Sequence, residues 1–242
     1  MDEQRSTDGR VLRGNARRER IIEAAVRRFA HNGYDKTRIA DIARDAGMTD
    51  AGLIHHFPTK NDLFMAVIRR REAVFTPVMA DEVRTVADMI VAFNVGVRSA
   101  TSEPDYVLFR AMLSGASVLD DHPATAHLAM RLTESLEVLV PFVARGIVSG
   151  ELLPDQDPRA IVLQLLALND GIRAQWALLP DEVDYADTLE AATHGYYRQI
   201  SGRDITDPAN KTFAWSEPFP GQGQGQGPGA KHKDRGDGES RR

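Results

Sequence analysis

The sequence predicts an all-α protein of about nine helices, and three observations support this fold class. Apolar residues recur at helical spacing through most of the chain, whereas almost no segment alternates with the period of two that is typical of strands. Gly and Pro residues interrupt the helical patterns at several points. Hydrophobic residues make up 42% of the 242 residues, so the chain can bury a sizeable core.

The first predicted helix ends near Gly33, which suits the left-handed backbone position that follows many helices. One face of this helix is apolar and carries Ile21, Ile22, Ala25, Val26 and Phe29. Thr37 is expected to cap the N-terminus of a second, shorter helix that runs to about Asp45.

The third predicted helix follows a turn at Gly47 and runs from its N-cap Thr49 to about His56. Thr59 and Asp62 then resemble a capping box, with Asp in place of the usual Glu or Gln. This pair is expected to open a longer helix that reaches about residue 80.

Five further helices are predicted in the rest of the chain. Their expected ranges are 84–101, 105–118, 123–149, 158–179 and 185–201. Pro77 and Pro141 lie inside or near the ends of helical patterns and predict bends or stops. From Gly202 the sequence is rich in Gly, Gln and charged residues that bury no apolar surface, so we expect a disordered tail.

The segment from Arg38 to Phe57 predicts a helix-turn-helix. Ala43 and Gly47 are small enough for two helices to cross closely, and Gly47 also suits the turn. Such a motif presents short or polar side chains of its second helix to the major groove of DNA. The candidates are Thr49, Asp50, Ala51, Gly52, His55 and His56, with Leu53 and Phe57 as buried anchors.

Charge is distributed unevenly along the chain. The net charge is −5, but residues 1–60 carry 12 Lys and Arg against 9 Asp and Glu, whereas residues 61–201 carry 11 against 20. A basic head on an acidic body fits a local DNA-binding surface, and ordinary scatter of charges is the alternative.

Five arginines precede the motif, at Arg10, Arg13, Arg17, Arg18 and Arg20. They predict either contact with DNA or a solvated, disordered arm.

Several classes of function are not expected. The chain has no cysteine, which excludes disulfides and thiolate metal sites. Neighbouring residues on a helix point about 100° apart, so His55 and His56 cannot chelate one ion together. We therefore predict no metal and no cofactor. No carboxylate or histidine pair has a spacing that suggests acid–base catalysis, and we do not expect an enzyme.

No apolar run approaches the roughly 18 residues of a membrane span, and the polar N-terminus lacks the apolar stretch of a signal peptide. We therefore expect a cytoplasmic protein without a membrane partner.

Residues Arg18 to Ile68 resemble the DNA-binding domain of the TetR family of bacterial transcriptional regulators. The resemblance rests on Phe29 and Gly33-Tyr34, on Thr37-x-x-x-Asp41-Ile42-Ala43, on Ala46-Gly47-Met48-Thr49, and on Leu53-Ile54-His55-His56-Phe57-Pro58-Thr59-Lys60. It implies a homodimer that binds a palindromic operator in double-stranded DNA, with one recognition helix per subunit in the major groove. It also implies a repressor rather than an activator, released by an unknown small-molecule effector that binds the C-terminal domain.

The resemblance also implies roles for particular residues. Thr37, Arg38 and Lys60 would meet phosphates, and the third helix would face bases or backbone. The full DNA-binding set is Arg18, Thr37, Arg38, Thr49, Asp50, Ala51, Gly52, Ile54, His55, His56 and Lys60. The family often has Lys or Arg where this chain has Asp50, and usually Tyr where it has Ile54. These departures leave open an alternative function, a helical module that binds small molecules and has weakened or lost DNA binding.

The expected C-terminal domain supplies the dimer contacts and the effector site. The segment from Pro158 to Leu179 is apolar nearly all round, so it must be buried on more than one side. Together with the last helix it predicts a dimer interface containing Leu165, Leu168, Ile172, Leu189, Tyr196 and Tyr197. Aromatic and polar residues within apolar patterns predict an effector site that contains Phe93, Phe109, Arg110, Met112, Asn169, Arg173 and Trp176.

The predicted domain organisation has four parts. They are a flexible arm over residues 1–14, a helix-turn-helix domain over 15–62, a helical ligand-binding and dimerisation domain over 63–201, and a disordered tail over 202–242.

Overall fold

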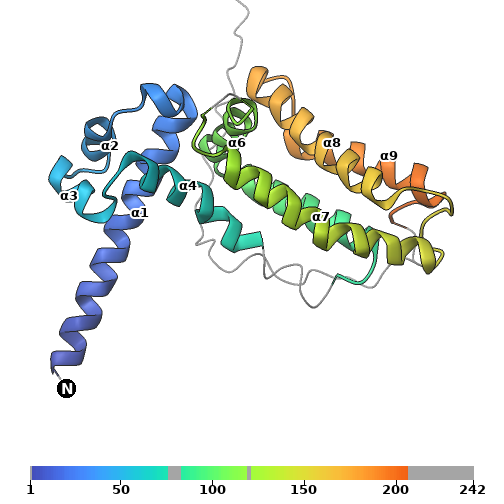
Figure 1. Ribbon diagram of the computed structural model, residues 1–242, viewed down its shortest axis with the longest axis horizontal. Helices are drawn as coiled ribbons and strands as arrows, with labels where there is room; N and C mark the ends of the chain where they lie inside the picture. The colour runs from blue at the N-terminus through green and yellow to red at the C-terminus, as the bar shows by residue number, and fades with distance from the viewer. Residues whose placement is uncertain (1, 76–82, 119–120, 207–242) are drawn as a thin grey trace, which may run out of the picture.

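The computed structural model describes residues 2–75, 83–118 and 121–206, apart from the side chains of residues 2–13 and 71–75, and shows nine helices and no strand within these ranges (Figure 1). The helices are α1 (Asp2–Lys36), α2 (Ile39–Asp45), α3 (Asp50–His56), α4 (Lys60–Phe75), α5 (Val86–Ala100), α6 (Pro104–Ala116), α7 (Thr125–Val148), α8 (Pro158–Leu178) and α9 (Tyr185–Ser201). The all-α fold class predicted from the sequence is therefore confirmed.

The ends of most helices lie within a few residues of the predicted ones. Pro141 lies inside α7, which continues to Val148, so it does not stop that helix. Pro77 and most of the tail, residues 207–242, lie outside the described residues. Among the residues that are described, no helix has both the length and the apolarity needed to cross a membrane.

The helices form two groups that lie side by side (Figure 1). We call α1 to α4 the head and α5 to α9 the body. The N-terminal part of α1 projects away from both groups, and the predicted arm, residues 1–14, continues this helix toward Asp2. The flexibility of this arm and the limits of the four predicted domains stay predictions.

The head and α6 share one hydrophobic core. Buried side chains of the head, among them Phe29, Leu53 and Phe64, belong to the same cluster as Phe109 and Leu113 of α6. A polar contact lies at the same junction, where His31 Nε2 lies 3.0 Å from Asp105 Oδ1. The position of the head is therefore tied to α6.

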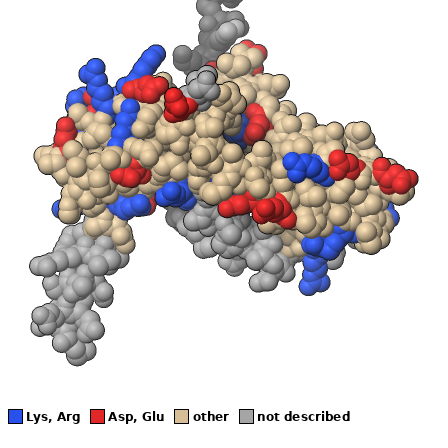
Figure 2. Space-filling model, in the orientation of Figure 1, with Lys and Arg blue, Asp and Glu red and all other residues tan. Residues whose placement is uncertain are grey.

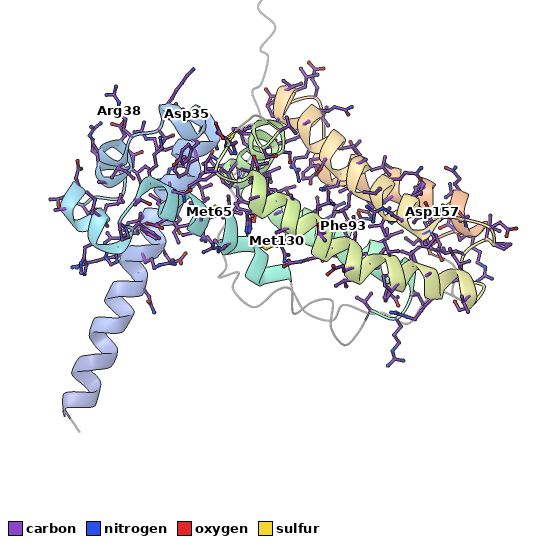
Figure 3. The ribbon with its side chains drawn as sticks, in the orientation of Figure 1. Asp35, Arg38, Met65, Phe93, Met130 and Asp157 are labelled. Atoms are coloured by element: carbon purple, nitrogen blue, oxygen red, sulfur yellow. The ribbon has the colours of Figure 1, made fainter. Side chains whose placement is uncertain are left out.

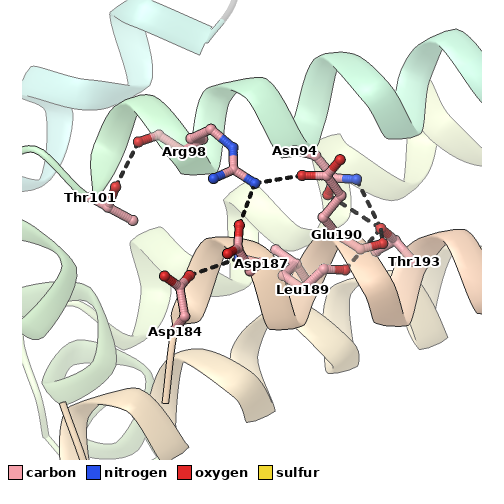
Figure 4. Close-up of polar contacts among 8 residues, drawn as sticks. All are labelled: Asn94, Arg98, Thr101, Asp184, Asp187, Leu189, Glu190 and Thr193. Atoms are coloured by element: carbon pink, nitrogen blue, oxygen red, sulfur yellow. Dashed lines mark hydrogen bonds and ion pairs between the residues drawn. The ribbon is translucent and has the colours of Figure 1, made fainter. Parts of the chain in front are cut away.

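The body has two further buried clusters and a polar seam between α5 and α9. In this seam the amide of Asn94 donates a buried hydrogen bond of 2.9 Å to Thr193 Oγ1. One turn away, Arg98 Nη2 lies 2.7 Å from Asp187 and 2.6 Å from Glu190 (Figure 4). These contacts fix α9 against α5, the helix that also forms one wall of the cavity described below.

Candidate nucleic-acid interface and effector cavity

The junction between α1 and α2 positions the helix-turn-helix. Gly33 has φ of 72° and ψ of 177°, so it takes a positive φ that suits glycine, but not the left-handed helical conformation predicted for it. Thr37 is buried, and its hydroxyl donates to the carbonyl of Gly33 over 2.7 Å and to that of Arg28 over 3.2 Å. The prediction that Thr37 caps α2 is wrong. The cap residue is Arg38, and the Thr37 hydroxyl instead donates to backbone carbonyls of α1.

An ion pair connects α2 to α1. Arg28 Nε lies 2.6 Å from Asp45 Oδ2 and its Nη2 lies 2.9 Å from Oδ1, so the guanidinium holds both carboxylate oxygens. The hydrogen bond from Arg28 lowers the pKa of the Asp45 carboxyl. Beyond it, Gly47 has φ of 68° and makes the predicted turn into α3.

Helix α3 is anchored on one side and open on the other. Thr49 Oγ1 accepts a hydrogen bond of 3.2 Å from the Gly52 amide, which confirms the predicted N-cap. Leu53 is fully buried and Phe57 nearly so. The exposed residues are Thr49, Asp50, Ala51, Ile54 and His55, and Gly52 and His56 are half-buried. The residues predicted to face DNA therefore lie on the outer side of a helix whose inner side is fixed.

Three cations of the head that are predicted to contact phosphates differ in exposure and in their contacts. Arg38 is exposed at the N-terminus of α2, on the head and far from Phe93 in the body (Figure 3). Arg18 is exposed and its guanidinium lies 4.9 Å from the centre of the Phe57 ring. Lys60 is held by the protein, because its Nζ donates to the Asp35 carbonyl over 3.2 Å, and burial lowers its pKa. On the visible face of the head, basic and acidic side chains are interspersed (Figure 2).

The start of α4 borders this surface. Thr59 and Asp62 form the predicted capping box, in which each side chain accepts a 3.0 Å hydrogen bond from the other residue's amide. A groove between α1, α3 and α4 brings Arg18 and His56 together with Arg69. The sequence pattern gave no signal for Arg69, because one exposed arginine on a helix resembles any other.

The body contains a cavity of about 590 Å³ between α5, α6, α7 and α8. Phe93, Arg110, Asn169 and Arg173 line it, as predicted. Three other predicted residues do not. Phe109 is fully buried in the core shared with the head, Met112 packs against that core, and Trp176 packs with Tyr185 and borders a separate hollow near the start of α9.

The cavity carries a polar network on its α6 and α8 walls. Arg173 Nη2 donates to Ser114 Oγ over 2.9 Å and to Asp170 Oδ1 over 2.7 Å. Tyr185 donates to Asn169 Oδ1 over 2.6 Å. Burial raises the pKa of Tyr185, and the positive charge of Arg173 acts in the opposite direction. Leu128, Leu132 and Leu166 form part of the apolar wall, which the sequence analysis did not identify.

The residues predicted to form the dimer interface divide into two groups. Leu189 and Tyr197 are fully buried and Ile172 is 8% exposed, so these three belong to the core of one subunit. This part of the prediction is corrected, because Ile172 and Leu189 pack with residues of α5 and α6, and Tyr197 packs with residues of α5 and α7, inside the subunit. Leu165, Leu168 and Tyr196 are half-buried. The outer faces of α8 and α9 instead expose small residues, namely Ala167, Gly171, Ala174, Ala191 and Gly195.

Comparisons with known proteins agree with this architecture. Residues 21–67, which contain the helix-turn-helix, match the family described as bacterial regulatory proteins, tetR family. The chain is 25% identical over 198 residues to the HTH-type transcriptional regulator RutR of Escherichia coli, covering 78% of this chain and 84% of RutR. It is 29% identical over 195 residues to the HTH-type transcriptional regulator TtgR of Pseudomonas putida, covering 72% of this chain and 86% of TtgR.

The fold also resembles that of a solved structure. A putative transcriptional regulator from Saccharomonospora viridis, crystallised in complex with choline, superimposes with a TM-score of 0.63 at 23% identity, covering 77% of this chain and 98% of that one. The helix-turn-helix geometry and the family match over it lead to one conclusion: residues 21–67 form a DNA-binding domain of the tetR family of bacterial regulatory proteins, in a chain whose full-length relatives are transcriptional regulators.

Proposed function

We propose that this DNA-binding transcriptional regulator acts as a homodimeric repressor that leaves its operator when a small molecule binds in the body. The observation that carries the proposal is the geometry of α3. Its inner residue Leu53 is fully buried, while Asp50, Ala51, Ile54 and His55 are exposed on the opposite side. A short helix fixed in this way can enter a major groove without unfolding the head.

The proposed roles of the head residues follow from their exposure. Exposed residues of α3 would meet base edges, and Asp50 is suited to accept from a cytosine amino group. Arg18 and Arg38 would meet phosphates, and so would Lys60 where it can leave its contact with Asp35. Thr37 would act by positioning α2, because its hydroxyl is used inside the protein.

The proposed dimer would pair α8 and α9 with the same helices of a second copy. The small exposed residues on their outer faces allow close approach of two helix pairs, and a two-fold interface uses the same surface on both subunits. Ala174→Glu should give a monomer in sedimentation velocity. Ala126→Glu, on the exposed face of α7, serves as the control and should remain dimeric. A monomeric parent chain would contradict this part of the proposal.

Effector binding would act through α6. This helix lines the cavity with Arg110 and Ser114 and packs against the head with Phe109. A ligand that favours a conformer with different head spacing would reduce the match to successive major grooves about 34–36 Å apart. A coupling of about 1–3 kcal/mol would change operator affinity roughly 5–150-fold.

A regulator of this kind acts on the bacterial chromosome, so we place it in the cytoplasm.

Footprinting on the DNA that flanks the gene for this chain tests the proposal. We expect protection of a palindromic site at moderate salt, and weaker protection at the same protein concentration in the Arg38→Gln variant. Failure of the parent protein to protect any site in that DNA would count against the proposal.

A second candidate function is supported by Asp50 and Ile54, which place a negative and an apolar side chain on the exposed face of α3. In this alternative the chain binds small molecules and no longer reads DNA. It predicts that the Asp50→Lys, Ile54→Tyr double variant gains DNA affinity where the parent has none. Substantial binding by the parent chain excludes it.

A further inference from the structure

We infer that the effector of this protein is an organic anion, a carboxylate attached to a mostly apolar body, and that Arg173 and Arg110 recognise its charged group. The inference rests on the proposed function, because it names the chemical class of molecule that would occupy the cavity of the body. It is carried by the charge, the burial and the hydrogen bonding of these two arginines.

Arg173 is a buried cation that keeps an unsatisfied donor. It is 5% exposed, its hydrogen bonds to Ser114 and Asp170 both come from Nη2, its guanidinium also interacts with the Tyr185 hydroxyl, and its Nε is buried without a partner among the described residues. A buried donor without an acceptor is costly, and a guanidinium matches the two oxygens of a carboxylate. Its one ionic partner among the described residues, Asp170, has a side chain that is 56% exposed and therefore compensates the charge weakly.

Arg110 adds a second cation on the facing wall. It lies one turn before Ser114 on α6, and Ser114 is the residue that accepts from Arg173. Within the described ranges the structure gives the Arg110 guanidinium no hydrogen-bond or ion-pair partner. Arg110 from α6 and Arg173 from α8 line the same cavity, together with Tyr185 from the start of α9.

The charge of the cavity favours an anion over a cation. Its charged lining residues are Arg110, Arg131, Arg173 and Asp170, so positive charges exceed negative ones. Arg131 pairs with Glu134 outside the cavity, whereas Arg110 has no ion-pair partner among the described residues and Arg173, although paired with Asp170, keeps a buried Nε without an acceptor. A quaternary ammonium such as choline would meet two like charges in this cavity.

The apolar walls of the cavity determine what the uncharged part of the ligand can be. Phe93, Val97, Leu128, Leu132 and Leu166 line the cavity from three helices. The volume of about 590 Å³ lies within the range of roughly 300–1,000 Å³ that is typical of sites for small organic molecules. A carboxylate bound to the arginines would place an aromatic or aliphatic chain against these side chains.

Titration calorimetry on the full-length protein tests the inference with matched probes. The probes are trans-cinnamate against trans-cinnamamide, decanoate against 1-decanol, and choline. We expect at least one carboxylate to bind about tenfold or more tightly than its neutral partner, with no binding of choline. Arg110→Gln should reduce this preference to less than about threefold. Arg145→Gln removes the same charge from the exposed end of α7 and should leave the preference unchanged.

Arg173→Gln provides a second test of the same site. Thermal unfolding shows whether this variant folds, and the Arg110→Gln result stands without it because Arg110 has no partner to lose among the described residues. The inference is overturned if carboxylates and neutral probes bind equally, if choline binds better, if no probe binds, or if both variants keep the anion preference.

Electrophoretic mobility-shift assays without ligand distinguish failure of this inference from failure of the proposed function. If the protein retards the flanking DNA but shows no preference for anions, only the proposed class of effector is refuted. An anion preference in a protein that binds no DNA would leave the cavity assignment standing and refute the regulatory function.

Discussion

Arg173 Nη2 and Ser114 Oγ are 2.9 Å apart, and the hydrogen bond between them joins α8 to α6 at the cavity. Helix α8 also presents the outer surface proposed for dimer contacts, and α6 packs against the head through Phe109. A ligand that competes for the Arg173 guanidinium would therefore act on both helices at once. The proposed effector site, the proposed dimer surface and the junction with the head are therefore connected through this contact.

Replacing Ser114 tests how much this contact contributes to stability. Ser114→Ala should lower the free energy of unfolding by about 1–3 kcal/mol, because hydrogen bonds to charged groups contribute more than neutral ones. Ser135→Ala is the matched control. Ser135 also lines the cavity and donates to the carbonyl four residues earlier, but it has no charged side-chain partner in the part of the chain that the structure describes. Denaturant titrations that give equal losses for the two variants would contradict the assigned role.

Thr37 is expected to act on DNA binding only through the fold. Thr37→Val removes a hydroxyl that donates to two backbone carbonyls of α1 and should lower the free energy of unfolding by about 1–3 kcal/mol. Thr37→Ser keeps the hydroxyl and should remain close to the parent. A Thr37→Val protein of parental stability that binds DNA poorly would show instead that this side chain contacts DNA.

Most of the helices and the turn chemistry of the head could be predicted from the sequence because these features are local. Gly47, Thr49 and the Thr59–Asp62 pair each have their partners within a few residues. The role of Thr37 could not be predicted in the same way. A threonine between two helices can cap the next helix or satisfy the last carbonyls of the preceding one, and only the tertiary positions of α1 and α2 decide between them.

The cavity and the outer surface were predicted less well because they depend on which side of each helix faces which neighbour. An apolar stripe such as that of Leu189 and Tyr197 has the same period whether it packs inside a subunit or against a second copy. Phe109 and Arg110 are adjacent in sequence, yet one lies in the shared core and the other in the cavity wall. Periodicity identifies buried faces but not what covers them.

Two substitutions in α3 should separate DNA contact from folding. His55→Ala, on the exposed face, should change stability by less than about 0.5 kcal/mol but weaken operator binding by about 1–3 kcal/mol. Leu53→Ala, on the buried face, should cost about 2–5 kcal/mol of stability. Fluorescence anisotropy on the protected DNA and denaturant titration measure the two effects. Parental operator affinity in His55→Ala would remove this residue from the proposed interface.

The salt dependence of binding tests the proposed phosphate contact of Arg38. Each phosphate neutralised by a cation contributes about 0.9 to the slope of log affinity against log salt concentration. Arg38→Gln should therefore reduce the magnitude of the slope by about 1 for each half-site. Arg145→Gln removes a charge from the body and should leave the slope unchanged. An unchanged slope in Arg38→Gln would show that this cation does not meet the DNA backbone.

Tyr197 should make the protein sensitive to alkaline pH. Burial, and then the nearby Glu151, raise the pKa of its phenol to about 12, compared with about 10 in an unfolded chain. The folded state holds the phenolic proton more tightly, so the stability that this residue contributes is present below pH 10 and is lost as pH rises toward 12. Tyr197→Phe cannot ionise, so its free energy of unfolding should fall less steeply than that of the parent between pH 10 and 12. Below pH 9 the Tyr197 phenol is protonated in both the folded and the unfolded state, so the stability profiles of parent and variant should run parallel. Profiles that stay parallel up to pH 12 would show that folding does not change the pKa of Tyr197.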